Sequence, residues 1–234
     1  MEEPKILFSK IKESAIIPSK ELEDAGYDIY ACWEGTSKKD RVISPHTTKL
    51  IPTGIACALP SDYYFQVEER GSTGSKGIKK SAGVVDSGYR GEIFIAITNT
   101  NDRHIIFDDK EKYLENALIE LLKWQQVDVD NLKEQDRQDM ENFLKQQSPT
   151  VYDSLPDETK ETLIRRTFID LRDPKQEENL RKNVNRAIFY PPDKAIAQLV
   201  LHKVYNLEVK EIPYDILKEI PSKRGANNLG SSGK

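Results

Sequence analysis

Hydrophobic residues follow two different patterns along the chain, and the change comes near residue 104. Over the first hundred residues, short runs rich in β-branched and aromatic side chains alternate with turn-forming segments such as Pro60-Ser61-Asp62. These runs have the length and composition of β-strands. The clearest are residues 49–52, 54–59, 63–67 and 92–97. The pattern predicts an all-β sandwich or barrel.

Beyond residue 104 the hydrophobic residues recur at helical spacing. A stripe at i, i+4 and i+8 predicts an amphipathic helix over residues 111–125. It consists of Tyr113, Ala117 and Leu121 beside Leu114, Leu118 and Leu122. A second helix is expected over residues 131–146, and its inward side chains would be Met140, Phe143 and Leu144.

Proline and acidic residues mark the starts of two further helices. One begins near Pro156, a residue type favoured in the first turn, and would bury Leu163, Ile164 and Phe168. The other begins at Asp173-Pro174, where the side chain of Gln176 can reach back to complete a capping box.

Strand-like segments return at residues 187–189 and 195–204, so the helices are most simply an insertion between two strands of one β domain. Glycine supports this division, because residues 92–224 contain none, whereas nine glycines lie between Gly26 and Gly91. We therefore expect a β-rich domain over residues 1–103 and 187–220, a helical insertion over 104–186, and a mobile C-terminal arm over 221–234.

Charge and composition narrow the class of protein. Of the 234 residues, 35 are Lys or Arg and 39 are Asp or Glu, which gives a net charge of −4. This balance argues against a nucleic-acid-binding or polybasic membrane surface, and no apolar run has the length of a membrane span. The two cysteines, Cys32 and Cys57, are expected to be buried thiols of a cytoplasmic protein.

Two stretches combine glycine with groups that bind metals or phosphates. In Asp24-Ala25-Gly26-Tyr27-Asp28, a carboxylate beside a glycine turn can hold a hard cation directly or through water; alternatively, the aspartate caps its own turn. Residues 69–77, which contain Arg70, Ser72, Thr73 and Lys76, offer hydroxyls, two cations and backbone N–H groups to a phosphate. An ordinary hairpin turn is the alternative there.

Two more stretches lie further along. In residues 83–91, Asp86 leaves an apolar strand and precedes Tyr89, so a partly desolvated base could take a proton from water beside a flat ring. The alternative is a β-hairpin whose turn Asp86 begins. Residues 224–233 combine glycine with an arginine and two serines; taken alone, they are most simply a disordered, solubilising terminus.

Taken in order, with Ala195-Ile196-Ala197-Gln198-Leu199 between the last two, these stretches resemble the five motifs of the trimeric dUTPase family, the deoxyuridine 5'-triphosphate nucleotidohydrolases. The resemblance covers both ends of the chain and leaves the helical insertion outside it. It implies a mainly β protein with a distorted jelly-roll-like (β-clip) fold. It also implies a homotrimer that hydrolyses dUTP to dUMP and pyrophosphate with Mg²⁺, each active site drawing motifs from three chains.

The resemblance also assigns roles to residues. Asp86 would orient and deprotonate the attacking water, Tyr89 would stack under the deoxyribose, and backbone around Gly83 would read the uracil edge. Asp28 would hold the magnesium through water. Contacts to the triphosphate would come from Arg70, Gly71, Ser72 or Thr73, and Gln198, and from the arm residues Arg224, Gly230, Ser231 and Ser232.

The chain departs from the family pattern at two motifs. The second reads Arg70-Gly71-Ser72 where the family has Arg-Ser-Ser or Arg-Ser-Gly, which leaves open whether Ser72 or Thr73 meets the bridging oxygen. In the fifth, Leu229 stands where the family has a phenylalanine that stacks on the uracil. We therefore expect a looser clasp of the base.

Two rival functions remain. A dCTP deaminase of the same fold needs a glutamate to activate water, where this chain has Asp86, and it would release ammonia from dCTP. A regulatory protein would instead act through a protein partner bound at the insertion, which is far longer than an ordinary loop. Hydrolysis retained after deletion of residues 108–186 would assign the insertion a role outside catalysis.

Overall fold

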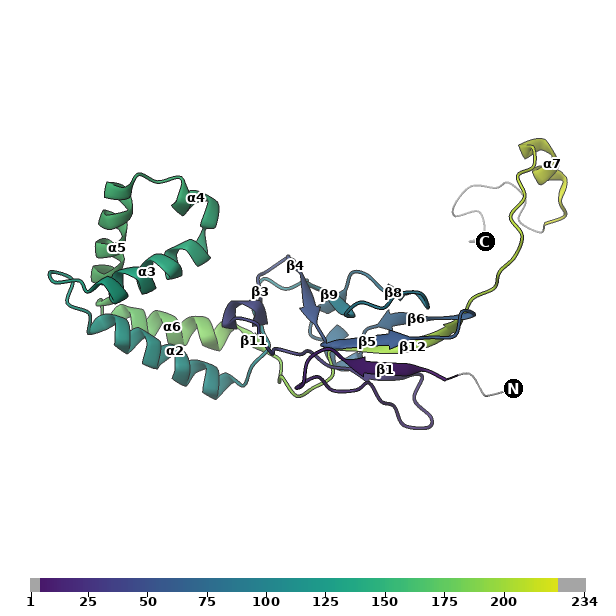
Figure 1. Ribbon diagram of the computed structural model, residues 1–234, viewed down its shortest axis with the longest axis horizontal. Helices are drawn as coiled ribbons and strands as arrows, with labels where there is room; N and C mark the ends of the chain where they lie inside the picture. Colours follow the sequence, from purple (N-terminus) through teal and green to yellow (C-terminus); the bar gives the residue numbers. More distant parts are fainter. Residues whose placement is uncertain (1–4, 223–234) are drawn as a thin grey trace, which may run out of the picture.

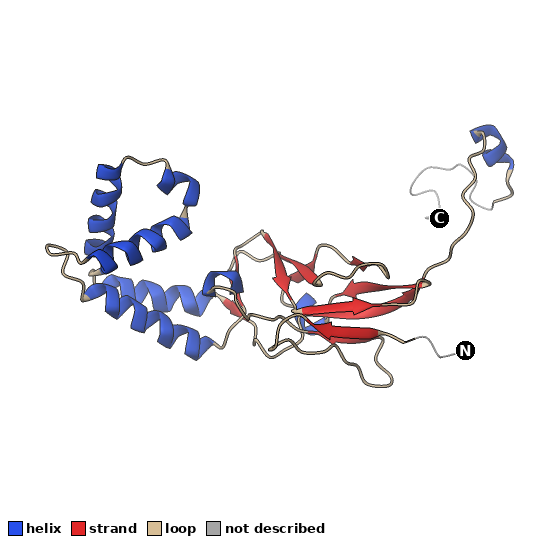
Figure 2. Cartoon of the chain, viewed as in Figure 1, coloured by secondary structure: helices blue, strands red, loops and turns tan. Residues whose placement is uncertain are grey.

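The chain forms an elongated molecule in which a body of β-strands and a lobe of helices lie end to end (Figure 1). The computed structural model describes residues 5–222. All the helices between β10 and β11 belong to this helical lobe, whereas the strands and two short helical turns form the β body (Figure 2). The mainly β fold with an added helical segment is as the sequence predicts.

Short strands make up the β body, and among the described residues they pair into four small sheets. The first sheet has the order β1-β5 and the second β11-β10-β3; the third is β2-β12-β6-β8 and the fourth β4-β9-β7. The strands are β1 (Leu7–Lys10), β2 (Gly26–Ile29), β3 (Val42–Ile43), β4 (Thr48–Pro52), β5 (Ile55–Ala58), β6 (Tyr63–Glu68), β7 (Ile78–Lys80), β8 (Val84–Val85), β9 (Phe94–Asn99), β10 (Ile105–Ile106), β11 (Ile188–Phe189) and β12 (Ala197–Lys203). The two short helical turns are η1 (Lys38–Arg41) and α1 (Gly71–Gly74).

Strand β12 organises the region in which most of the candidate residues lie. It pairs antiparallel with β2 on one side and with β6 on the other, so Gln198 lies opposite both Asp28 and Glu68. Because facing residues of neighbouring strands have Cβ atoms only about 4.5–5.5 Å apart, this register places the first and fourth motifs side by side. The second motif begins where β6 ends.

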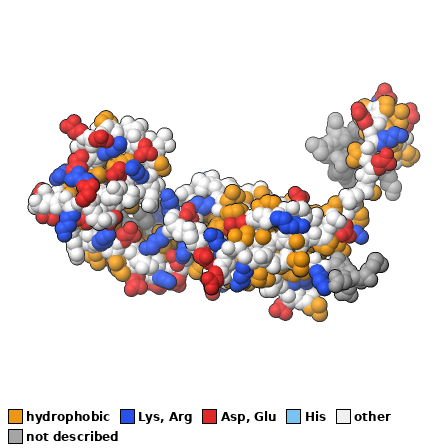
Figure 3. Space-filling view, in the orientation of Figure 1, with side chains coloured by type: hydrophobic (Ala, Val, Ile, Leu, Met, Phe, Trp, Pro, Cys, Tyr) orange, Lys and Arg blue, Asp and Glu red, His pale blue; other side chains and the backbone are white. Residues whose placement is uncertain are grey.

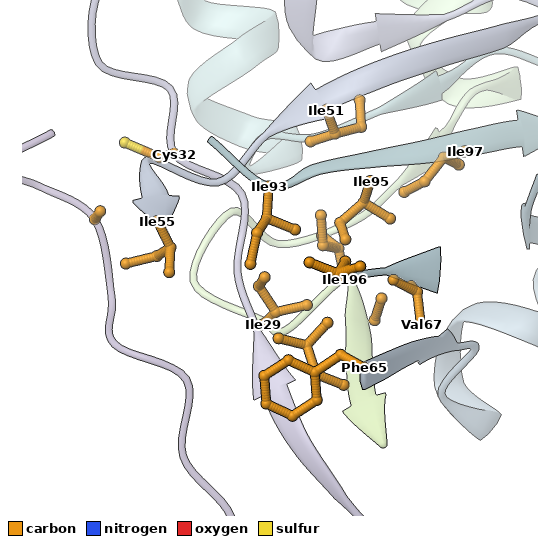
Figure 4. Packing of buried hydrophobic residues seen from close by; sticks show 14 of the residues in the cluster. Ile29, Cys32, Ile51, Ile55, Phe65, Val67, Ile93, Ile95, Ile97 and Ile196 are labelled. Atoms are coloured by element: carbon orange, nitrogen blue, oxygen red, sulfur yellow. The ribbon is translucent and has the colours of Figure 1, made fainter. Parts of the chain in front are cut away.

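An isoleucine-rich core holds the sheets together (Figure 4). Its fully buried members include Ile29, Ile51, Ile55 and Phe65. Burying such a side chain contributes about 1.5–3 kcal/mol. The site residues are therefore carried by strands that the core fixes in place.

Helices α2 (Lys110–Gln125) and α6 (Lys175–Arg186) pack against each other next to the β body, and the rest of the lobe lies beyond them (Figure 1). The other helices are α3 (Glu134–Gln147), α4 (Pro149–Asp153) and α5 (Asp157–Leu171). The lobe has a core of its own, made of Trp124, Val127, Val129, Met140, Ile164 and Phe168. A last short helix, α7 (Tyr214–Glu219), follows β12 and lies away from both parts.

Several details of the helical lobe differ from the sequence-based expectation. Helix α3 begins at Glu134 rather than at residue 131, because the Asp128 carboxylate accepts the backbone N–H groups of Asp130 and Asn131 and holds a turn there. These bonds, and one from the Asn131 side chain, lower the pKa of Asp128. Leu122 was expected on the buried stripe but is 52% exposed.

Helix α5 begins near Pro156, as predicted, whereas the start of α6 differs from the prediction. Pro156 precedes the first residue of α5 instead of occupying it, and α4 was not foreseen. At the start of α6, Gln176 donates its side-chain N–H to the carbonyl of Asp170, so the expected capping box does not form. Asp173 instead accepts the backbone N–H of Lys175.

Both cysteines are free and buried, as expected. Burial raises the pKa of the Cys57 thiol, which keeps it protonated and unreactive near neutral pH. Within residues 5–222, no helix combines the length and hydrophobicity needed to cross a bilayer.

Candidate functional site

Three of the stretches singled out in the sequence converge on one open pocket of about 350 Å³. The turn before β2 and β2 itself supply one wall, α1 with the residue before it supplies another, and β12 supplies the third. The lining residues are Asp24, Ala25, Gly26, Asp28, Arg70, Gly71, Ser72 and Gln198.

An ion pair joins the first two stretches inside this pocket. The Arg70 Nε lies 2.9 Å from Asp28 Oδ1, and both side chains are about one-third exposed, at 31% and 32%. Arg70 also donates from Nη1 to the carbonyl oxygen of Ala195, at 3.2 Å. The guanidinium is thus held from two sides, with part of its surface open to the pocket.

Gln198 fixes the third wall. Its Nε2 donates to the carbonyl of Glu69, at 3.0 Å, which ties β12 to the residue just before Arg70. Gly26 pairs with Val200 on β12, and a Cβ added to Gly26 would lie 3.0 Å from both Cβ and Oε1 of Gln198. Glycine is therefore needed at position 26 for the close approach of these two strands.

The two hydroxyl groups left open by the sequence have different surroundings. Thr73 is 1% exposed, and its Oγ1 donates to the Arg70 carbonyl at 2.9 Å and accepts the Arg70 N–H at 3.1 Å. Ser72 is exposed and lines the pocket. The Thr73 hydroxyl therefore holds the turn together, whereas Ser72 is open to the pocket.

Asp86 and Tyr89 do not line this pocket. They lie in the turn that follows β8, where the Asp86 carbonyl accepts the Tyr89 N–H at 3.1 Å and both side chains are exposed. The predicted strand-to-turn arrangement around Asp86 is present. One chain alone does not bring Asp86 to Asp28 and Arg70.

The Tyr89 side chain bonds back to its own turn. Its hydroxyl donates to the Glu92 carbonyl, at 2.9 Å, and a Cβ on Gly91 would come within 2.5 Å of that oxygen. Gly83, at the start of the same stretch, gives its carbonyl to the N–H of Val67, at 2.7 Å, which joins the stretch to β6.

The arm residues expected to bind phosphate and base lie outside the described part of the chain. These are Arg224, Leu229, Gly230, Ser231 and Ser232.

A magnesium ion fits the chemistry of the pocket. Mg²⁺ usually keeps several waters and takes one or two carboxylates together with substrate phosphates. Asp28 supplies one such carboxylate, beside a cationic side chain suited to phosphate. Residues 5–222 contain no cluster of three or more His, Cys, Asp or Glu side chains able to hold a metal by themselves.

A larger cleft of about 890 Å³ separates η1 and β4 from helices α2 and α3. Lys49 is on its wall, but its Nζ already donates to the carbonyls of Lys39, Asp40 and Val42. None of the candidate residues lines this cleft, so its size does not make it the site.

Two of the contacts that shape the site have no sequence signal. The carbonyl of Ala195 accepts from Arg70, and the carbonyl of Glu69 accepts from Gln198. Both residues belong to stretches singled out in the sequence, but every residue has a carbonyl, so the role of these two carbonyl groups could not be predicted. Only the pairing of β12 with β2 and β6 brings them to the pocket.

Comparison with known sequences agrees with this geometry. The family model described as dUTPase matches residues 12–141, more than half of the chain. The deoxyuridine 5'-triphosphate nucleotidohydrolase of Leptospira interrogans is 33% identical over 108 residues, which cover 44% of this chain and 72% of that protein. That of a Hydrogenobaculum species is 32% identical over 139 residues, covering 58% and 93%.

A solved structure has a similar fold over nearly the full length of this chain. The dUTPase of Staphylococcus bacteriophage 80alpha, solved with dUPNHPP, aligns with a TM-score of 0.53 at 20% identity, over 98% of this chain and 99% of that one. The extent of the family match and the similarity to the nucleotidohydrolases lead to one conclusion: the chain belongs to the dUTPase family.

Proposed function

We propose that this protein hydrolyses dUTP to dUMP and pyrophosphate. The observation that carries the proposal is the pocket in which Asp28, Arg70, Ser72 and Gln198 meet, in a chain of the dUTPase family. A carboxylate, a guanidinium, a hydroxyl and an amide in one open pocket suit a metal-bound polyphosphate.

In the proposed reaction, Asp86 takes a proton from water as the water oxygen bonds to the α-phosphorus. The bond from that phosphorus to the α–β bridging oxygen breaks, and pyrophosphate leaves. Phosphoryl transfer of this kind requires positioning, charge neutralisation and a directed water, with no covalent intermediate. Asp86 is exposed after a short strand, where a second chain can reach it.

Arg70, Gln198 and Ser72 bind the triphosphate in this proposal, with Gly71 offering backbone. Between the two hydroxyls, Ser72 is the better candidate for the bridging oxygen, because Thr73 is buried and bonded to Arg70 at both its donor and acceptor positions. A bound phosphate would share Arg70 with Asp28, which is already 2.9 Å away.

Magnesium would be held by the substrate phosphates and, through water, by Asp28. When bound, it would neutralise charge that develops on the phosphate oxygens. Asp28 and Arg70 then have complementary tasks: the carboxylate orients the hydrated cation, and the guanidinium binds the anion.

Tyr89 and Gly83 would determine sugar and base selectivity. The Tyr89 side chain bonds back to Glu92 of its own turn and lies against Gly91, and its ring would exclude a 2′-hydroxyl by shape. The backbone around Gly83 would recognise the edge of the uracil. This stretch leads into β8, which is an edge strand of its sheet.

The homotrimer is part of the proposal, because the pocket of one chain lacks Asp86 and Tyr89. The segment after β12 also supports assembly, since its large apolar side chains have no cover within the described chain. Tyr205, Leu207 and Val209 are 76%, 81% and 95% exposed. Such a surface is typical of a protein–protein contact.

The proposal is tested by comparing turnover of dUTP, dTTP, dCTP and UTP with and without Mg²⁺. We expect dUTP to be the only one of the four nucleotides that yields pyrophosphate. A chelator should abolish this activity, and added Mg²⁺ should restore it. Ammonia release from dCTP would favour the deaminase, and equal turnover of all four nucleotides would contradict the assigned base and sugar contacts.

Replacing Leu229 by phenylalanine would tighten the hold on the base. An aromatic ring adds about 0.5–1.5 kcal/mol of stacking beyond area burial, so we expect the KM for dUTP to fall about two- to tenfold. Steady-state kinetics on the Leu229→Phe variant measure this. Unchanged KM and kcat would show that position 229 does not contact the uracil.

A protein partner at the helical lobe remains a prediction. Deleting residues 108–186 and joining the ends with a short linker would separate the two roles. We expect the shortened protein to retain dUTP hydrolysis, because none of the proposed catalytic residues lies in the deleted segment. Loss of activity in a folded trimer would instead tie the lobe to catalysis.

A further inference from the structure

Tyr190 is a fully buried tyrosine, with 0% of its side chain exposed, and it lies where the chain returns from the helical lobe. It directly follows β11, and its backbone N–H donates to the Ile106 carbonyl of the strand that leads into the lobe, at 2.8 Å. Figure 1 shows β11 at the junction of the lobe and the β body.

The hydroxyl of Tyr190 donates to the Ala195 carbonyl, at 2.7 Å. This bond closes the turn formed by residues 190–195, within which Lys194 N–H also donates to the Pro191 carbonyl. A hydroxyl buried with a good acceptor is stabilising, and its loss loosens the turn that it closes.

The same carbonyl accepts Arg70 Nη1, at 3.2 Å, and Arg70 Nε pairs with Asp28. Tyr190, the Ala195 carbonyl, Arg70 and Asp28 therefore form one continuous chain of polar contacts. Its first member is buried at the base of the helical lobe, and its last two line the pocket.

The ring of Tyr190 is held by other contacts. It packs edge-on against Phe107, with ring centroids 5.7 Å apart, and Lys76 Nζ lies 5.4 Å from its centroid. Phe107 is the residue that follows β10, so the two ends of the lobe meet in this aromatic pair. Ring packing and hydroxyl bonding can thus be separated by one substitution.

We propose that Tyr190 is a positioning residue for the triphosphate: its hydroxyl fixes the Ala195 carbonyl, which holds Arg70 in the orientation that binds phosphate. This inference rests on the proposed function. It assigns to the base of the helical lobe a part in supporting the phosphate site, through a residue that touches neither substrate nor metal.

The Tyr190→Phe variant keeps the ring and removes the hydroxyl. A lost hydrogen bond of about 0.5–1.5 kcal/mol corresponds to about a two- to tenfold rise in KM for dUTP, and kcat should change less than about twofold because Asp86 is not involved. Tyr152→Phe is the matched control: its hydroxyl is also buried but has no hydrogen-bond partner among residues 5–222, so KM should stay unchanged.

A double-mutant cycle with Arg70→Ala tests whether Tyr190 acts through Arg70. We expect Tyr190→Phe to leave KM unchanged when Arg70 is already absent. An equal rise in both backgrounds, or no rise in either, would overturn the inference. The proposed function is tested separately by the unaltered protein, because it fails if that protein releases no pyrophosphate from dUTP, whatever the KM values of the variants.

Discussion

Replacing Asp86 by asparagine should abolish most of the turnover of dUTP while leaving its binding intact. Asparagine has nearly the same shape but cannot take a proton from water. General-base catalysis typically contributes about a hundred- to ten-thousandfold, so kcat should fall by that factor. The dissociation constant for dUTP, measured by calorimetry on the inactive variant, should change less than about threefold.

Asp102→Asn provides the matched control. The Asp102 side chain is 95% exposed and hydrogen-bonded to His46, and an exposed contact of this kind contributes little to stability. The Asp102→Asn variant should retain full turnover of dUTP. If Asp86→Asn lost binding and turnover together, with a lower Tm, Asp86 would have a structural role in its turn and the assigned base would be wrong.

Replacing Arg70 by alanine should weaken dUTP binding more than any other single change on the phosphate side. A hydrogen bond to a charged group contributes about 1.5–3 kcal/mol, so we expect a KM about ten- to a hundredfold higher. Asp28 would also lose its partner at 2.9 Å. The affinity for dUTP should drop far more than that for deoxyuridine, which has no phosphate.

Arg181→Ala is the matched control, since Arg181 pairs with Glu177 on the exposed face of α6 and does not line the pocket. The Arg181→Ala variant should leave the KM for dUTP unchanged. Equal losses of affinity for dUTP and for deoxyuridine in Arg70→Ala would contradict a phosphate-binding role. They would indicate that the arginine supports the pocket as a whole.

The strands that could be predicted are those with continuous apolar runs. Residues 63–67 are predicted to form a strand because alternate side chains face the core, and β6 includes all of these residues. Strands such as β3 and β10 have only two residues each, and they pair with each other across more than sixty positions. No local pattern signals a pairing so distant in sequence.

The same distinction applies to the site. Asp28, Arg70 and Gln198 could be identified from glycine-rich stretches in a recognisable order, and the structure brings them into one pocket. The hydrogen bonds between the Thr73 hydroxyl and the Arg70 backbone could not be predicted, because they depend on the turn that α1 makes. The shared Ala195 carbonyl likewise depends on the fold, since it joins residues 70 and 190.

Hydrolysis of dUTP in water labelled with a heavy oxygen isotope tests the central claim most directly. If water attacks the α-phosphorus, the label appears in dUMP and the pyrophosphate is unlabelled. Label in the pyrophosphate, or release of labelled inorganic phosphate with dUDP, would place the attack at another phosphorus and contradict the account.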